Sequence, residues 1–308
     1  MKIMKLTDIG SRPEDVAPYI ADDDWIMQQK LDGARMQAIY METPEEAVGT
    51  WTFTNDGVAP IKFAAALLVL PQLEAELEKW RQATAPGANQ ITFDGELIIE
   101  TGTYHIFDVL EWHDWAARQQ LITPEHSLAG RIAFLHGLGL EASWRPHVKL
   151  SPTAWTSDEK AAMWAAVQEA GVEGAVSKHL HSTYLPGART KQWLKHKLVK
   201  DADVVVLNAT RTFKPNGVVE KGSAVFGVYV GDKLKKIGAA SLIGKDLTIS
   251  RGDVVKIAYL YLGENGSPVQ PRIIEKRDDK LPEECTWEQF PPYTRAIAWQ
   301  AAAEKEAH

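Results

Sequence analysis

The sequence has little of several features that would narrow its class at once. It contains one cysteine, Cys285, in 308 residues, and a single thiol excludes an internal disulfide or a zinc site built on several cysteines. No apolar run reaches the roughly 18 residues that a membrane-spanning helix needs. The first residues, MKIMKLTDIGSRPEDV, lack the apolar core of a signal peptide. We therefore expect a soluble, cytoplasmic protein.

What the chain does contain is ordinary for a globular protein, with 45% hydrophobic and 24% charged residues. Its length suggests two domains. The formal net charge of -7 does not favour nucleic-acid binding, but residues 176–256 hold 15 lysines and arginines against 6 acidic residues. This asymmetry fits either a basic track on an acidic body or a merely uneven surface, and charge alone does not decide between them.

The first two thirds of the chain mix strand-like and helix-like segments. Strands are expected within residues 25–41, 91–100 and 104–112. Helices are expected in the segments FAAALLVLPQLEAELEKWRQ and SDEKAAMWAAVQEAG. In the second of these, Met163, Val167 and Ala170 recur at helical spacing, which predicts an amphipathic helix packed on the core.

The sequence pattern changes after about residue 200, where five strand-like segments are separated by Gly, Asp, Asn and Pro. These segments are DADVVVLNATR, GSAVFGVYV, KLKKIGAAS, DVVKIAYLYL and PRIIEKRD. Five strands in about 100 residues fit a small β-barrel, and the OB-fold is the commonest barrel of this kind that binds nucleic acid. We place the boundary near residues 198–203, which gives domains 1–200 and 201–308. The tail TRAIAWQAAAEKEAH is expected to be a terminal helix or a frayed end.

Five short motifs with chemically useful side chains follow one another along the chain. They are Lys30-Leu31-Asp32-Gly33-Ala34-Arg35, Phe93-Asp94-Gly95-Glu96, Phe107-Asp108, Glu173-Gly174 through Lys178, and Trp193-Leu194-Lys195-His196-Lys197. Each alone has a plain structural interpretation. Asp32-Gly33 is typical of a hairpin turn, the second motif puts a carboxylate at the mouth of an apolar strand, and alternate lysines share one side of a strand. Their joint occurrence in this order is improbable by chance.

In these motifs the sequence resembles the covalent nucleotidyltransferase superfamily of ATP-dependent DNA ligases, RNA ligases and mRNA capping enzymes. The resemblance extends from about Trp25 to Cys285, and the K-x-D-G-x-R motif of the family matches Lys30 to Arg35. A sixth motif, Pro271-Arg272 followed by Arg277-Asp278-Asp279-Lys280, is similar to the form found in DNA ligases. The resemblance implies an α+β nucleotidyltransferase (ATP-grasp-like ligase adenylation) domain followed by a small β-barrel OB-fold domain.

The activity implied by the resemblance is that of an ATP-dependent DNA ligase. Lys30 takes AMP from ATP, AMP passes to the 5′-phosphate of a nick, and the 3′-hydroxyl then displaces AMP. A lysine amine attacks phosphorus only after it loses its proton, which desolvation or nearby cations favour. Lys195, Lys197 and a bound metal would supply those cations and neutralise the α-phosphate as pyrophosphate leaves.

The resemblance also implies a set of site residues. Phe107 would stack on adenine, and Gln28 either hydrogen-bonds the base edge or is an ordinary strand residue. Arg35 and Glu96 would hold the ribose, and Lys178 would face phosphate. The catalytic residues are Lys30, Lys195, Lys197, Arg277, Asp279 and Lys280; the nucleotide-binding residues are Gln28, Leu31, Arg35, Glu96, Phe107, Glu173, Lys178, Lys195 and Lys197. Glu96 and Glu173 are the expected Mg²⁺ ligands, because hard cations prefer oxygen, and Mn²⁺ is the alternative metal.

The chain departs from the family near the first motif. There the family often has Ser-Arg-x-Gly, whose arginine meets the 5′-phosphate of the nick, whereas this chain has Thr54-Asn55-Asp56-Gly57. Asparagine cannot form a bidentate salt bridge with phosphate, so another cation substitutes or the nick is held differently. Arg12 is a candidate substitute.

We therefore expect a minimal ligase of two domains, a monomer, that acts on nicked double-stranded DNA and not at a membrane. ATP is expected in place of NAD because the N-terminal segment of NAD-dependent ligases is not found. The segment 212–222, with Pro-Asn-Gly at its centre, is too short for a hairpin that encircles a duplex. The alternatives are an RNA ligase, a capping enzyme, or a non-catalytic OB protein that binds nucleic acid.

Overall fold

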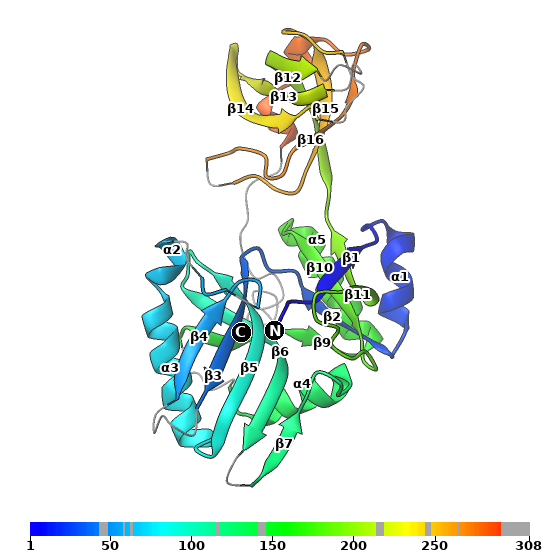
Figure 1. The fold of residues 1–308 in the computed structure, drawn as a ribbon. Helices are drawn as coiled ribbons and strands as arrows, with labels where there is room; N and C mark the ends of the chain where they lie inside the picture. The colour runs from blue at the N-terminus through cyan, green and yellow to red at the C-terminus, as the bar shows by residue number, and fades with distance from the viewer. Residues whose placement is uncertain are drawn as a thin grey trace. The chain divides into compact units, whose positions relative to one another are not determined.

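A computed structural model of the chain describes residues 1–42, 49–57, 59–61, 64–114, 117–140, 146–213, 219–243, 248–263 and 265–290. The described residues form two compact units (Figure 1). The first comprises residues 1–167 and 174–196, and the second comprises residues 168–173 and 197–290. None of the described helices has the length and apolar character needed to cross a membrane.

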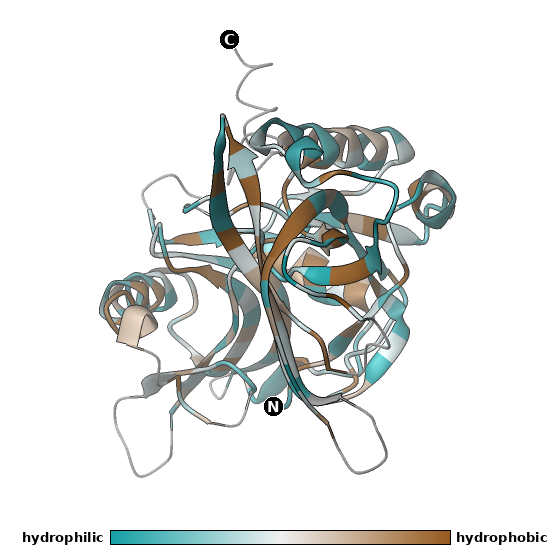
Figure 2. Cartoon of the chain, turned by 90° about the horizontal axis from the view of Figure 1, so that it is seen from above, coloured by the Kyte–Doolittle hydropathy of each residue, from teal (hydrophilic) through white to brown (hydrophobic). Residues whose placement is uncertain are grey.

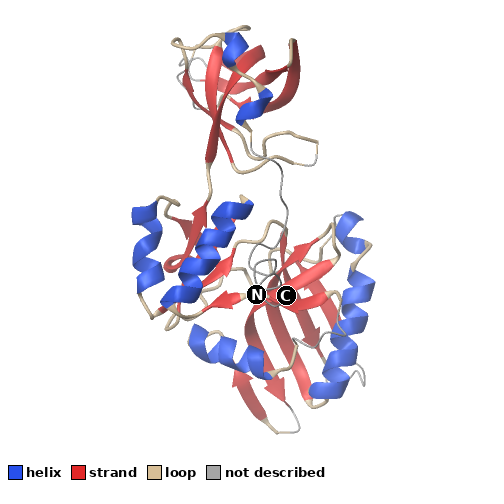
Figure 3. Cartoon of the chain, turned by 180° about the vertical axis from the view of Figure 1, so that it is seen from behind, coloured by secondary structure: helices blue, strands red, loops and turns tan. Residues whose placement is uncertain are grey.

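The first unit contains two sheets with helices on their outer sides (Figure 3). The five-stranded sheet has the order β1-β11-β10-β2-β9. Its strands are β1 (Lys5–Asp8), β2 (Trp25–Gln29), β9 (Thr153–Ala154), β10 (Gly174–His179) and β11 (Arg189–Lys197), and its helices are α1 (Pro13–Ala21) and α5 (Ser157–Ala170).

The six-stranded sheet has the order β4-β3-β5-β6-β7, with β8 paired to β6. Its strands are β3 (Ala34–Met41), β4 (Thr50–Thr54), β5 (Ala88–Ile98), β6 (Thr103–Asp114), β7 (Gln119–Ile122) and β8 (Val148–Leu150), and its helices are α2 (Ala64–Leu67), α3 (Leu70–Thr84) and α4 (Leu128–Gly137). Leu73, Leu77 and Trp80 recur at helical spacing on α3 and are fully buried in the core that covers this sheet. Hydrophobic segments accordingly gather on the strands (Figure 2).

The hairpin interpretation of Asp32-Gly33 is wrong. Strand β2 pairs with β10 and β9, whereas β3 pairs with β4 and β5, so the chain passes from one sheet to the other at these residues. All five residues of β2 are buried, and a strand buried in this way needs a partner on each side. A side chain at Gly33 would collide with the carbonyl oxygen of Leu97, so the crossing requires glycine.

The helix predictions are confirmed with one change. Residues Ser157–Ala170 of the second segment form α5, with Met163 and Val167 buried. The segment 63–82 is not one helix but two, because Pro71 has no backbone N–H to donate within a continuous helix. The second helix begins at Leu70, which puts Pro71 in its first turn, where no donor is needed.

The second unit contains the five strands that the sequence predicts. They are β12 (Lys200–Phe213), β13 (Val219–Val230), β14 (Lys233–Ser241), β15 (Val254–Tyr259) and β16 (Arg272–Lys276), followed by the 3-10 helices η1 (Pro282–Glu284) and η2 (Trp287–Gln289). The sheet order is β14-β13-β12-β15-β16, and among the described residues no strand pairing closes it into a barrel. Val204, Phe226 and Ile257 lie fully buried in its core.

Two predicted segments fall largely outside the description. Strands β12 and β13 pair as far as Phe213 and Val219, but residues 214–218, which include Pro-Asn-Gly, are not described. The tail at residues 294–308 also lies outside the described residues.

Candidate active site

A pocket of about 460 Å³ in the first unit collects side chains from both sheets. It is lined by Leu6, Gln28, Gln29, Lys30, Leu31, Arg35, Glu96, Phe107, Ser151, Val176, Lys178 and Trp193. Seven of these are site residues predicted from the sequence: Gln28, Lys30, Leu31, Arg35, Glu96, Phe107 and Lys178.

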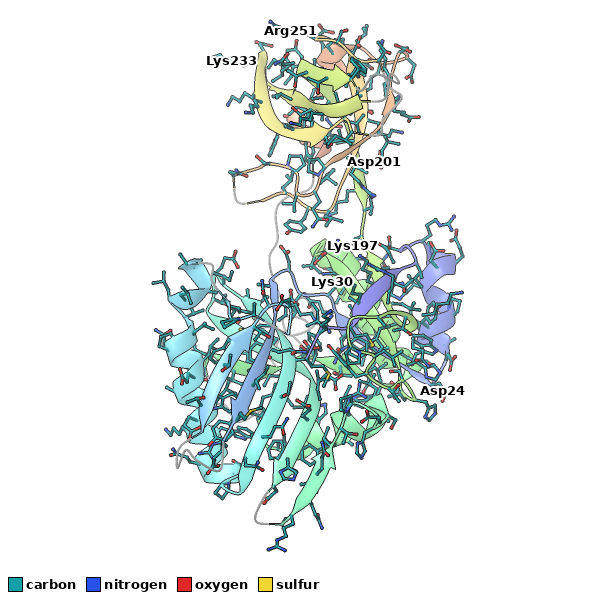
Figure 4. The ribbon with its side chains drawn as sticks, in the orientation of Figure 1. Asp24, Lys30, Lys197, Asp201, Lys233 and Arg251 are labelled. Atoms are coloured by element: carbon teal, nitrogen blue, oxygen red, sulfur yellow. The ribbon has the colours of Figure 1, made fainter. Side chains whose placement is uncertain are left out.

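Lys30 enters the pocket directly after β2 (Figure 4). Its backbone N–H donates to the carbonyl of Gly174 at 2.9 Å, and the register of β2 against β10 places Gln29 opposite Ala175. The first motif and the beginning of the fourth are therefore joined by backbone hydrogen bonds, although they are far apart in the sequence.

Arg35 is held at the pocket wall by Asp94. Its Nε and Nη2 donate to the two carboxylate oxygens at 3.1 and 2.7 Å, and its Nη1 donates to the carbonyl of Met4 at 2.5 Å. Burial lowers the pKa of Arg35, but the charge and the hydrogen bonds of Asp94, with smaller contributions from Tyr184 and Glu96, together outweigh burial, so the net shift of the pKa is upward. Asp94 is fully buried in the interior of β5, which corrects our expectation of a carboxylate at the mouth of a strand: Arg35 compensates the charge inside the fold.

Tyr184 completes this cluster. Its hydroxyl donates to Asp94 Oδ2 at 2.9 Å and accepts from the backbone N–H of Met4 at 2.9 Å. Burial, and then the charge of Asp94, raise the pKa of Tyr184. The tyrosine thus stays neutral and links the N-terminal segment to the third motif.

Lys178 occupies an aromatic environment in the pocket. Its Nζ lies 4.1 Å from the ring centroid of Phe107 and 4.2 Å from that of Trp193. No described residue accepts a hydrogen bond from this buried ammonium. Burial lowers the pKa of Lys178 to about 7. A buried cation with open hydrogen-bonding capacity is suited to meet an anionic ligand.

Asp108, which follows Phe107, is bound by Arg131 from α4. Arg131 Nε and Nη2 donate to the two carboxylate oxygens at 2.9 Å each, and both side chains are fully buried. This bidentate pair fixes the strand next to the aromatic ring of Phe107. No motif predicted Arg131; its one signal is a charge within the apolar segment LAGRIAFL.

Lys195 and Lys197 are both in β11, as alternate residues. Lys195 Nζ lies 3.5 Å from Asp8 Oδ2 in the first unit. Within the second unit, Lys197 Nζ lies 3.0 Å from Glu173 Oε1. Neither lysine is among the residues that line the pocket.

In the second unit, Asp203 binds the cations of the sixth motif. Arg277 Nη1 lies 3.2 Å from Asp203 Oδ1, and Lys280 Nζ lies 2.8 Å from Asp203 Oδ2. Asp279 accepts two hydrogen bonds from Arg277 at 2.8 Å each, and these lower the pKa of Asp279 to about 2. No motif surrounds Asp203 in the sequence, because its role depends on residues more than seventy positions away.

Two further predictions concern the nick and the metal. Arg12, proposed as the cation that replaces the missing arginine, is exposed and paired with Asp15 and Glu14. The described residues contain no group of three or more His, Cys, Asp or Glu side chains that could bind a metal. Glu96 does line the pocket.

Three pocket residues lie outside the set that the sequence predicts and carry polar or aromatic groups: Gln29, Ser151 and Trp193. Trp193 belongs to the fifth motif, but only the two lysines of that motif were predicted as site residues. Ser151 has no motif around it. It reaches the pocket because its backbone N–H donates to the carbonyl of Ile106 at 2.8 Å, a contact that spacing in the sequence does not reveal.

Comparisons with known proteins bear on the fold and on part of the sequence. Residues 101–197 match the family model of the ATP-dependent DNA ligase domain. A solved structure from a study of Lig E DNA ligases, described as binding DNA with a minimal scaffold, has 17% identity and a TM-score of 0.53, with 89% of this chain and 100% of that chain covered. A structure named Pmar-Lig_Pre has 14% identity and a TM-score of 0.61, covering 89% and 68%.

A mycobacterial DNA ligase D complexed with ATP and MES has 17% identity and a TM-score of 0.49, covering 93% of this chain and 98% of that chain. The search of curated proteins gives no match. The family match confirms the resemblance, and the solved structures with the higher TM-scores show the same nucleotidyltransferase-type ligase fold. Residues 101–197 thus match an ATP-dependent DNA ligase domain, and the chain has the nucleotidyltransferase-type fold of the solved DNA ligases.

Proposed function

We propose that the chain seals nicks in double-stranded DNA through a Lys30–AMP intermediate and a DNA-adenylate. The observation that carries this proposal is the convergence of separate motifs on one pocket. Lys30, Glu96, Phe107 and Lys178 come from distant parts of the sequence and line the same cavity. A non-catalytic DNA-binding protein has no need for this arrangement.

In the first step, the Nζ of Lys30 forms a bond to the α-phosphorus of ATP, and the bond from that phosphorus to the bridging oxygen of pyrophosphate breaks. The proton of Lys30 passes to solvent. Phe107 stacks on the adenine, with Leu31 beside it, while Arg35 and Glu96 hold the ribose. Lys178 offers its open hydrogen bonds to phosphate, where a cation lowers the barrier to displacement.

We assign the cations outside the pocket to the α-phosphate and to the pyrophosphate that leaves it. Lys195 and Lys197 neutralise the α-phosphate. Arg277 and Lys280 bind the departing pyrophosphate, and Asp279 orients Arg277 through its two hydrogen bonds. In the later steps the 5′-phosphate of the nick takes up AMP, and the 3′-hydroxyl then attacks it and releases AMP.

A divalent metal fits the donor set of the pocket. Mg²⁺ is usually bound by one or two carboxylates together with phosphate oxygens and water, so a single pocket carboxylate is sufficient protein ligation. Glu96 is the ligand we propose in the first unit, and Glu173 remains a prediction from the sequence. When bound, the metal supplies positive charge to the phosphates; Mn²⁺ has the same oxygen preference.

We further propose that residues 1–200 form the adenylation domain and residues 201–308 an OB-fold domain. Five antiparallel strands in one sheet support the second assignment. The two edge strands, β14 and β16, also approach one another, as closure of a barrel requires.

The test is sealing of a labelled, nicked DNA duplex with ATP and Mg²⁺. The wild-type chain should join the strands, and Lys30→Arg should not, because a guanidinium stays protonated and cannot attack. Nicked DNA should be sealed faster than nicked or single-stranded RNA. Faster joining of single-stranded RNA would replace this proposal with the RNA-ligase alternative, and sealing by Lys30→Arg would remove Lys30 from the mechanism.

A further inference from the structure

The segment between β8 and β9 joins the two sheets at the pocket. Strand β8 pairs with β6 of the six-stranded sheet, and β9 pairs with β2 of the five-stranded sheet. Ser151 lies between these strands, with its N–H bound to the carbonyl of Ile106, next to Phe107. This segment therefore reaches the pocket beside Phe107, whose ring we propose to stack on adenine.

A chain of hydrogen bonds fixes the side-chain amide of Gln28. The Thr153 hydroxyl donates to the carbonyl of Ser151 at 3.1 Å, and Gln28 Nε2 donates to Thr153 Oγ1 at 2.8 Å. A hydroxyl has one proton to give. Because Thr153 gives that proton to Ser151, it can only accept from Gln28, so the amide nitrogen must face Thr153. The amide oxygen of Gln28 is then the group left for a ligand.

Ser151 adds a second polar group to the same wall. The residue is 6% exposed and lines the pocket, and its hydroxyl has no hydrogen-bond partner among the described residues. Its backbone N–H and carbonyl are already used by Ile106 and Thr153. Buried hydroxyls are nearly always satisfied in complete structures, so this one points to a bound molecule with a polar edge.

The resemblance already implies that Gln28 meets the base edge; we propose that Thr153 is the positioning residue that sets the amide of Gln28 for a 6-amino purine, and that Ser151 adds a second contact to that edge. The proposal rests on the function proposed above. The oxygen of Gln28 accepts from the 6-amino group, and the hydroxyl of Ser151 donates to ring nitrogen N1. A 6-oxo purine presents an acceptor to the oxygen of Gln28, so this contact fails, whereas the hydroxyl of Ser151 can turn and accept from the N1 proton.

The first test compares ATP with inosine triphosphate, which has a 6-oxo group, as labels for Lys30. Wild-type protein should prefer ATP in kcat/KM by about 100-fold or more, as expected for a site that hydrogen-bonds a substrate group. Thr153→Val removes the hydroxyl and frees the amide to turn, so the preference should fall by about tenfold. Thr153→Ser should restore it.

The matched control is Thr52→Val on β4, an exposed threonine in a strand, which should leave the preference unchanged. Circular-dichroism melting separates loss of fold from loss of discrimination, and Thr153→Ser keeps the test decisive if Thr153→Val does not fold. An unchanged ratio in Thr153→Val, or a loss of preference in Thr153→Ser equal to that in Thr153→Val, overturns the role of Thr153.

The second test uses 1-deaza-ATP, which lacks the N1 acceptor. Wild-type protein should use it about tenfold less well than ATP, whereas Ser151→Ala should use the two equally. A penalty for 1-deaza-ATP that persists in Ser151→Ala contradicts base reading by Ser151. Labelling of wild-type Lys30 by ATP and by inosine triphosphate at equal rates would overturn this inference and leave the ligase function standing, whereas no labelling by any nucleotide would overturn both.

Discussion

Asp94 in the first unit and Asp203 in the second each bind the cations of a sequence motif, but the two carboxylates are buried to different degrees. The Asp94 side chain is 0% exposed and holds Arg35, which is 17% exposed. The Asp203 side chain is 12% exposed and is shared by Arg277 and Lys280, which are 24% and 25% exposed. Asp94 has a further partner in Tyr184, and Arg277 has a further partner in Asp279.

This difference in burial suggests different roles for the two clusters. The Asp94 pair stabilises the fold, whereas the cations bound to Asp203 can exchange it for another anion. Removing a partner from a buried pair leaves a charge that water cannot reach, and that loss is large. A pair near the surface is partly solvated already, so its cations can release one anion and take up another at small cost. Arg35 is therefore expected to stay with Asp94, whereas Arg277 and Lys280 can leave Asp203 for a phosphate.

The largest expected effect is on stability. Asp94→Asn should lower the free energy of unfolding by about 3–5 kcal/mol, because the guanidinium of Arg35 loses its buried carboxylate. Asp203→Asn, the matched substitution in the second unit, should cost clearly less. Urea denaturation followed by circular dichroism measures both. Equal losses would remove the contrast between the two clusters.

The next effect is on one catalytic step. Lys280→Ala should slow self-adenylylation by about 100-fold, as expected when a cation that stabilises a departing phosphate is lost. Sealing of a nick that already carries DNA-adenylate should change by less than about threefold, since no pyrophosphate leaves in that step. Quenched-flow assays of the two reactions test this separation, and an equal loss in both would contradict the assignment of Lys280.

A smaller effect concerns Lys178 and pH. Burial lowers its pKa from 10.5 to about 7 in the folded chain, so the unfolded chain binds a proton first as the pH falls. Burial of the charged Lys178 side chain therefore lowers the free energy of unfolding by its full amount below about pH 7 and has no effect above about pH 10.5. Lys178→Met should raise the melting temperature by a few degrees, about 2–5 °C, at low pH, and this gain should vanish at high pH. A gain that is independent of pH would show that the charge of Lys178 is not the cause.

The smallest effect is expected from exposed lysines of the second unit. Lys233 extends outward from β14 (Figure 4), and Lys235 and Lys236 are exposed on the same strand. If residues 176–256 form a basic track, neutralising Lys235 and Lys236 together with Lys221 and Lys214 should flatten the dependence of nick affinity on salt. Each lost phosphate contact should reduce the slope by about 0.9. An unchanged slope would favour the uneven-surface interpretation; the position of Lys214 itself is outside the described residues.

The sequence predicted the elements of both units well because their signals are local. The five strands after residue 200 are bounded by turn residues, and Met163 and Val167 mark the buried face of α5. The plain hairpin interpretation of Asp32-Gly33 fails because strand pairing is not local. Two strands joined by a tight turn normally pair, but here the partners of β2 come from β10 and β9, more than a hundred residues later.

The pocket shows the same limit. Lys30, Glu96 and Phe107 could be predicted because each belongs to a short motif whose residues lie next to one another in the sequence. Tyr184 and Ser151 could not be found in this way, since the first acts through Asp94, ninety positions away, and the second through a backbone bond to Ile106. Residues that position other residues act through tertiary contacts, and such contacts cannot be inferred from a single sequence.

The central claim is that the pocket activates Lys30 as the nucleophile that takes AMP. Mass spectrometry of peptides after incubation with ATP and Mg²⁺ tests it most directly, with Lys30→Arg as the matched variant that keeps the charge. We expect one AMP adduct on the wild-type peptide that contains Lys30, lost in acid as a phosphoramidate is, and no adduct on the variant. An adduct on another lysine, or one that persists in Lys30→Arg, would contradict it.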